Sequence, residues 1–216
     1  ADHCLERDAR GIFESEERTT ETLAFKAFGL VKAGEVPFQI VNPTQAASGR
    51  NLVVLRGSQG FAKTLPQKVE IPNVLVRATR LHFLGGVGAG AWPCCGANKN
   101  EGLPVARVSV LYTDGQQEQF YLTNGVEFVD YSNVDADVSG SKRVPGLLAG
   151  GQVRAFSRAL TGKAPIEKIA LESFDNSIVP VFVALTAETG EKTDRVPREQ
   201  EAGKRGAEPP KSGPGQ

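Results

Sequence analysis

Asn133, Asp135 and Asp137 place oxygen-bearing side chains at alternate positions of the segment VEFVDYSNVDADVSGSK (126–142). Oxygen ligands alternate in the same way in calcium-binding loops. The segment has no Gly at the sixth position of such a loop and no Glu at the twelfth, which excludes an EF-hand. A single structural Ca²⁺ at these residues is kept as an alternative to a solvated loop, and no other cofactor is expected.

Groups for nucleophilic or acid–base catalysis are sparse. Ser139 and Lys142 match the S-x-x-K spacing of some acyl-transfer enzymes, in which a helix places the Lys one turn beyond the Ser. Here Gly140 separates them in a segment that resembles a loop. Of the 2 His in the chain, only His82 lies in an apolar run. We therefore predict that the protein is not an enzyme.

The 3 Cys of the chain are too few for a disulfide scaffold. Cys94 and Cys95 are adjacent, so a bond between them would need a strained ring, and a bond from one of them to Cys4 is simpler. A metal site is the alternative, but the pair lacks the two-residue spacing of zinc sites. The disulfide and the free thiols both remain open.

Trp92, the only Trp of the chain, follows the glycine-rich segment LHFLGGVGAG (81–90). This segment lacks the G-x-G-x-x-G spacing of a dinucleotide loop. Its glycines instead allow a long loop to turn and to carry the indole to one end of the domain. A ligand-binding role for Trp92, with Asn98 and Lys99 from the same loop, stands beside the alternative that the Trp belongs to the core.

Asp130 and Tyr131 come directly after an apolar run, where an aromatic ring and a carboxylate would lie side by side. Carbohydrate recognition needs this pairing, because the C–H face of a pyranose packs on a ring while fixed polar groups bond the hydroxyls. The alternative is a solvated loop rich in Asp and Asn.

Short β-rich runs broken by Gly, Pro and Asn fill the chain between about residues 23 and 187, and no long stripe of 3.6-residue period occurs. The pattern predicts an all-β fold with two antiparallel sheets packed as a β-sandwich. Asp114-Gly115 marks one well-specified hairpin turn, and the last run has apolar residues on both faces, as in a strand covered on both sides. The expected strands are 23–28, 36–41, 51–55, 67–71, 78–84, 106–112, 118–122, 152–160, 166–174 and 179–187.

Composition excludes several classes of protein and sets the domain limits. The 216 residues carry 25 basic and 25 acidic side chains, so no nucleic-acid or acidic-lipid partner is indicated. No run approaches the roughly 18 apolar residues of a membrane span. We expect a polar segment at 1–22 that docks on the domain, a β-sandwich at 23–188 and a disordered linker or tail at 189–216.

Several segments together resemble the galactose-binding-like jelly-roll modules of bacterial extracellular multidomain proteins. The resemblance implies a jelly roll with ligand sites in loops at one end or on a concave face, and Trp92 and Tyr131 fall where such modules carry aromatic residues. The insertion WPCCGANKNEG (92–102) departs from a generic sugar site. The segments are VPFQIVNP (36–43), GRNLVVLRG (49–57), LPQKVEIP (65–72), ATRLHFLGGVG (78–88), VARVSVLYTDGQ (105–116), NGVEFVDY (124–131) and IEKIALESFDNSIVPVFVALTAE (166–188).

Taken together, the sequence favours a secreted or periplasmic, non-catalytic module that binds a carbohydrate or glycan. The expected binding residues are Trp92, Asn98, Lys99, Asp130 and Tyr131. A structural domain that packs on a neighbouring domain of a larger protein, or on a second copy, is the second hypothesis. A hydrolase that uses Asp130 with Glu127 or Asp135 is the third, although nothing in the sequence fixes the separation of the carboxylates.

Overall fold

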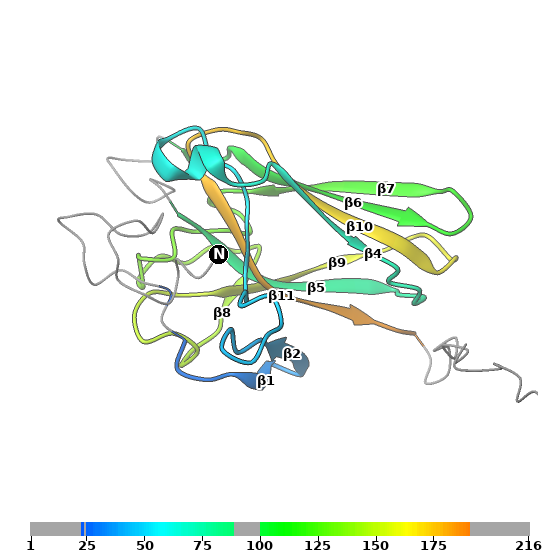
Figure 1. The fold of residues 1–216 in the computed structure, drawn as a ribbon, viewed down its shortest axis with the longest axis horizontal. Helices are drawn as coiled ribbons and strands as arrows, with labels where there is room; N and C mark the ends of the chain where they lie inside the picture. The colour runs from blue at the N-terminus through cyan, green and yellow to red at the C-terminus, as the bar shows by residue number, and fades with distance from the viewer. Residues whose placement is uncertain (1–22, 24, 89–99, 191–216) are drawn as a thin grey trace, which may run out of the picture.

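Two β-sheets lie face to face in the computed structural model, which describes residues 23, 25–88 and 100–190 (Figure 1). The four-stranded sheet has the order β4-β10-β6-β7 and every neighbouring pair is antiparallel. Its strands are β4 (Lys68–Pro72), β10 (Ile166–Ser173), β6 (Pro104–Tyr112) and β7 (Gln117–Thr123).

The five-stranded sheet has the order β3-β11-β5-β9-β8, again antiparallel throughout. The described residues contain one short 3₁₀ helix (Gly60–Thr64) and no other helix. Within this part of the chain, no helix has the length and apolar character needed to cross a membrane. The expected all-β sandwich is therefore confirmed. The strands are β3 (Val53–Val54), β11 (Val179–Glu188), β5 (Arg80–Gly88), β9 (Arg154–Ala159) and β8 (Lys142–Arg143).

The main core lies between the two sheets and is centred on aromatic rings. Phe83 and Phe156 on neighbouring strands stack with ring centroids 5.1 Å apart, and Phe128 meets Phe156 edge-on at 5.2 Å. Each such contact contributes about 0.5–1.5 kcal/mol beyond the burial of apolar area. Strand alternation supplies the rest of this core from the inward faces of both sheets.

A second core covers the outer face of the five-stranded sheet. The hairpin of β1 (Gly29–Ala33) and β2 (Val36–Ile40) packs there, with Phe38 buried against the side of β11 that carries Val181 and Val183. The Thr186 hydroxyl donates a 2.6 Å hydrogen bond to the Pro37 carbonyl and ties the hairpin to β11. The prediction that the last strand is covered on both faces is thus confirmed.

The predicted hairpin at Asp114-Gly115 is also confirmed. Strands β6 and β7 pair along their length, and Gly115 takes the positive φ of 84° that the turn requires. The Asp114 carboxylate accepts a hydrogen bond from the backbone N–H of Gln116 at 3.1 Å. The side chain therefore stabilises the turn that the sequence specifies.

Two of the strand predictions need correction. Residues 23–28 form no strand in their described part, and Phe25 makes only an isolated bridge to Leu148. Strand β5 continues to Gly88, through glycines that were expected to begin a loop. The reason is packing, because a Cβ on Gly85 would lie 2.3 Å from the Val181 carbonyl oxygen on β11. Glycine at this position allows the two strands to approach closely.

Candidate functional site

Asp130 is buried, and its side chain is hydrogen-bonded within the domain. Its side chain is only 6 % exposed, and its Oδ1 accepts hydrogen bonds from the Ser132 hydroxyl at 2.7 Å and the Ser132 backbone N–H at 3.0 Å. Asp130 also forms an isolated bridge to Val87 on β5. The carboxylate thus closes a local turn beside the end of the central strand β5.

Tyr131 is 4 % exposed and belongs to the second core. Its backbone N–H donates to the Val87 carbonyl at 2.9 Å, and a Cβ on Gly151 would lie 2.5 Å from the Tyr131 carbonyl oxygen. Both the ring and the backbone are therefore closely packed. In this conformation the ring has no open face on which a sugar could stack.

The other predicted binding residues, Trp92, Asn98 and Lys99, lie outside the described residues, as do Cys4, Cys94 and Cys95. Those predictions stay predictions. The described residues on either side of the segment are Gly88, which pairs with Val179 at the start of β11, and Asn100. The Asn100 carbonyl accepts a 2.8 Å hydrogen bond from the side chain of Asn124, just beyond β7. Both residues therefore lie at the end of the sandwich where β7 ends and β11 begins.

Two of the three alternating side chains of the calcium hypothesis, Asn133 and Asp137, are engaged with protein donors. The Asn133 side-chain oxygen accepts from the backbone N–H groups of Asp135 and Ala136 at 3.2 and 3.1 Å. The Asp137 carboxylate accepts from the Arg154 guanidinium at 2.6 Å, and this hydrogen bond lowers the pKa of Asp137. The described parts of the chain contain no group of three or more His, Cys, Asp or Glu side chains arranged to hold a metal ion.

An aromatic pair that the sequence analysis missed lies on the outer face of the four-stranded sheet. Tyr121 on β7 and Phe174, just beyond β10, have ring centroids 5.8 Å apart and ring planes tilted by 41°. The side chains are 53 % and 42 % exposed. Strand alternation turns Tyr121 outward, because its neighbours Phe120 and Leu122 pack toward the core. The same alternation in EQFYL is the signal that could have identified it.

Polar groups surround this pair. Arg107 on β6 lies opposite both Tyr121 and Glu172, and its guanidinium donates a 2.6 Å hydrogen bond to the Glu172 carboxylate. That bond raises the pKa of Arg107. Ser109 and Gln119 face each other across the next outward position of β6 and β7. We name the following six residues the Tyr121 face: Arg107, Ser109, Gln119, Tyr121, Glu172 and Phe174.

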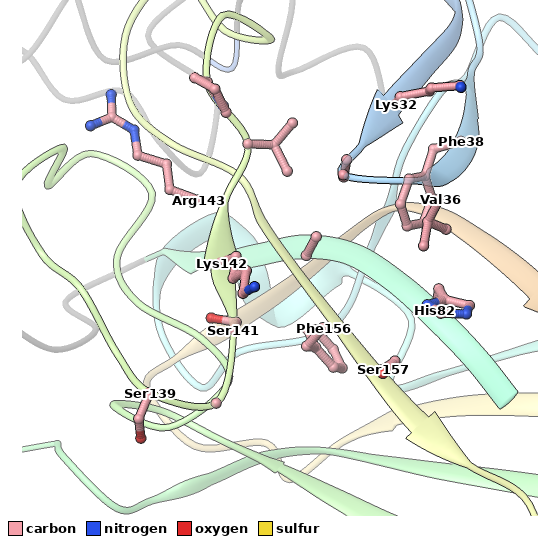
Figure 2. A pocket seen from close by; sticks show the side chains of 16 residues that line it. Lys32, Val36, Phe38, His82, Ser139, Ser141, Lys142, Arg143, Phe156 and Ser157 are labelled. Carbon is pink, nitrogen blue, oxygen red and sulfur yellow. The ribbon is translucent and has the colours of Figure 1, made fainter.

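A cleft of about 630 Å³ opens on the other side of the molecule, between the β1–β2 hairpin and residues 139–145. Its floor is the outward face of β5 and β9, where His82 lies opposite Ser157, and Ala155 lies opposite Lys142 on β8. Figure 2 shows Lys142 and His82 at opposite ends of this floor. The His82 Nε2 is 2.7 Å from the Glu188 carboxylate at the end of β11.

Ser139 and Lys142 of the S-x-x-K spacing both line the cleft, but not on a helix. A Cβ on Gly140 between them would lie 2.6 Å from the Val126 carbonyl oxygen, so the segment is held as a tight turn against its neighbour. The arrangement therefore lacks the helical turn that places a Lys beside its Ser.

Comparison of the chain with protein-family models, with curated proteins and with solved structures found no match. The function is therefore inferred from the residues of the candidate sites.

Proposed function

We propose that this protein is a non-catalytic carbohydrate-binding module and that it binds its glycan at the Tyr121 face. The observation that carries the proposal is the exposed Tyr121–Phe174 pair beside the Arg107–Glu172 ion pair. The proposal includes a jelly-roll connection of the galactose-binding-like type and a secreted or periplasmic location. The first is compatible with the two packed antiparallel sheets, and both rest on the resemblance of the sequence.

The chemistry of the face suits a sugar. Pyranose C–H groups pack on aromatic faces, and both rings of the pair present accessible surface. Charged groups strengthen hydrogen bonds to hydroxyls, and the guanidinium of Arg107 and the carboxylate of Glu172 offer donors and acceptors next to the rings. Because the two groups hold each other, their positions are fixed before the ligand arrives.

The location of the face also agrees with the sequence prediction for Trp92, Asn98 and Lys99. The residues that flank this segment, Gly88 and Asn100, lie at the end of the sandwich where β7 ends. Tyr121 is near the end of β7, and Phe174 follows β10 at the same end, where Ser173 lies opposite Ala106. We propose that the three residues extend the Tyr121 face into a longer binding site.

Screening on a glycan array tests the proposal. We expect the full chain to retain a glycan, and the Tyr121→Ala and Trp92→Ala variants to retain less of it. Leu30→Ala is the matched control, because Leu30 is 71 % exposed on the β1–β2 hairpin, away from the face. If the wild type retains no glycan on the array, the proposal is refuted.

A protein-interaction domain is the second candidate, and one observation favours it. Leu103 and Val126 are each 39 % exposed close to the end of β7, which adds exposed apolar side chains to this end of the sandwich. Clustered exposed apolar side chains mark protein interfaces as well as ligand sites. Light scattering separates the candidates: a dimer that Tyr121→Ala converts to a monomer would favour a contact between copies.

A further inference from the structure

We propose that the cleft between the β1–β2 hairpin and residues 139–145 is a second binding site, for a small organic anion with an apolar body. The cleft lies on the outer face of the five-stranded sheet, whereas the Tyr121 face lies on the outer face of the four-stranded sheet. The two sites are therefore separate, and this inference does not depend on carbohydrate binding.

The size of the cleft suits a small molecule. Its volume of about 630 Å³ is within the range of about 300–1,000 Å³ that is typical of ligand pockets. The hairpin forms one wall, residues 139–145 form the other, and strands β5 and β9 form the floor (Figure 2). A ligand in this space would have protein on three sides.

The charge of the lining is of one sign. Its charged side chains are Lys32, Lys142 and Arg143, and no Asp or Glu is among the lining residues. The carboxylate of Glu188 lies beyond the floor and is already bonded to His82, with the Arg80 guanidinium 3.8 Å away. An adjoining hollow, lined in part by the same Lys142 and Arg143, also contains Asp135 and Asp137. The cleft itself presents cations to an anion, and no carboxylate is among its lining residues.

Lys142 is the cation best placed to contact a ligand. It shares the outward side of the sheet with Ala155, its partner on β9, and lies over the cleft floor (Figure 2). Arg143 turns away from the cleft and donates to the Val134 carbonyl at 2.9 Å. Lys32, on the hairpin, carries its ammonium group away from residues 139–145 (Figure 2). Its charge acts over the roughly 10 Å range of electrostatic attraction at 0.1 M salt.

The Lys142 side chain has no structural task among the described residues, unlike that of Arg154, which lies opposite Arg143 on β9. Arg154 is 1 % exposed and donates to Ser141, Asp137 and several carbonyls, which explains its presence by folding alone. For the Lys142 side chain the structure gives neither a hydrogen bond nor an ion pair within the part of the chain that it describes. Its exposed ammonium group is therefore available to a ligand.

The apolar side chains in the walls of the cleft indicate that the ligand has an apolar part. Val36 of the hairpin, Ala155 of β9 and Pro145 line the cleft beside the cations and keep part of their surface exposed, while Phe38 and Val144 lie buried behind them. Apolar lining with a few charged groups favours a molecule whose hydrocarbon part is buried and whose anionic group reaches the rim. Carboxylates and phosphate monoesters share this chemistry.

Three naphthalene probes test the proposal: 2-naphthoate, 2-naphthyl phosphate and the neutral 2-naphthol. We expect calorimetry on the full chain to show binding of at least one of the anions, at least tenfold tighter than that of 2-naphthol. The bound anion identifies which anionic group the cleft prefers. Amide shifts in nitrogen–proton NMR spectra should map to residues 139–145, β9 and the hairpin.

Single substitutions identify which of the lysines contribute to binding of the anion. Lys142→Gln should weaken binding of the preferred anion about tenfold, since a charge-assisted contact is lost. Lys32→Gln should weaken it about two- to threefold, through the loss of longer-range attraction. Lys63→Gln, which removes an exposed lysine that does not line the cleft, should leave the affinity unchanged.

Four results would overturn the proposal: no binding of either anion, equal affinity for 2-naphthol, shifts that map outside the cleft, or an unchanged affinity in Lys142→Gln. A loss of glycan binding in Tyr121→Ala with unchanged naphthoate or naphthyl phosphate binding would show that the two sites act separately.

Discussion

The guanidinium of Arg154, which is 1 % exposed, donates a 2.6 Å hydrogen bond to the carboxylate of Asp137, which is 84 % exposed. The same guanidinium donates to the Ser141 hydroxyl at 2.9 Å and the Ser141 carbonyl at 2.8 Å. This one side chain therefore holds the turn that leads into β8 and so fixes the wall of the cleft that carries Lys142.

Replacement of Arg154 by Met should lower the free energy of unfolding by about 3 kcal/mol, because several buried acceptors lose their donor. Chemical denaturation of the variant measures this loss. Arg143→Met is the control: Arg143 is exposed and donates to one carbonyl, so its loss should change the stability by less than about 0.5 kcal/mol. Equal losses in both variants would show that Arg154 does not hold the turn.

The contribution of the Arg154–Asp137 hydrogen bond to the free energy of unfolding should decrease in acid. The hydrogen bond from Arg154 lowers the pKa of Asp137 from its ordinary 3.8, so the bond stabilises the folded state above that pH. As the pH falls below 3.8 and through the lowered pKa, the stabilisation is lost. The difference in stability between the wild type and Asp137→Asn should be constant near neutral pH and shrink in this acid range. A difference that grows in acid would contradict the assignment.

Gly85 should tolerate no side chain, while its neighbour Gly86 should tolerate one. A Cβ on Gly85 would lie 2.3 Å from the Val181 carbonyl oxygen, which is backbone and cannot rotate away. Gly85→Ala should therefore lower the free energy of unfolding by about 1–3 kcal/mol or more. At Gly86 the nearest atom to such a Cβ is 3.7 Å away, an ordinary contact, so Gly86→Ala is the matched control. Thermal melts of the two variants would refute the packing explanation if their midpoints matched.

Local sequence patterns predicted those parts of the fold that local interactions specify. The β6–β7 hairpin follows from alternation and from Asp114-Gly115, and both features act within a few residues. The hairpin with β1 was missed as a unit, because its strands are short and Leu30 is exposed in the middle of β1. The extension of β5 through Gly85 depends on Val181, which comes much later in the chain.

The candidate site shows the same limit. The apolar run before Asp130 and Tyr131 forms a turn with isolated bridges and no strand. The burial of the two residues depends on the second core, which the β1–β2 hairpin helps to build. The outward position of Tyr121 could be read from its strand. Its contact with Phe174 could not, because it requires β6 to lie between β7 and β10.

Trp92→Ala should weaken glycan binding while leaving the stability of the sandwich unchanged, if the residue extends the Tyr121 face as proposed. Affinity by calorimetry and stability by denaturation, measured on the same preparation, separate binding from folding. A large loss of stability with an unchanged affinity would assign Trp92 to the core instead.

The affinity of the Tyr121 variants for a glycan selected on the array is the most direct test of carbohydrate binding at the sheet face. We predict that Tyr121→Ala raises the Kd about tenfold or more, because the stacking surface of the ring is lost, whereas Tyr121→Phe, which keeps the ring, stays close to the wild type. An unchanged Kd in Tyr121→Ala would contradict the assignment of the site.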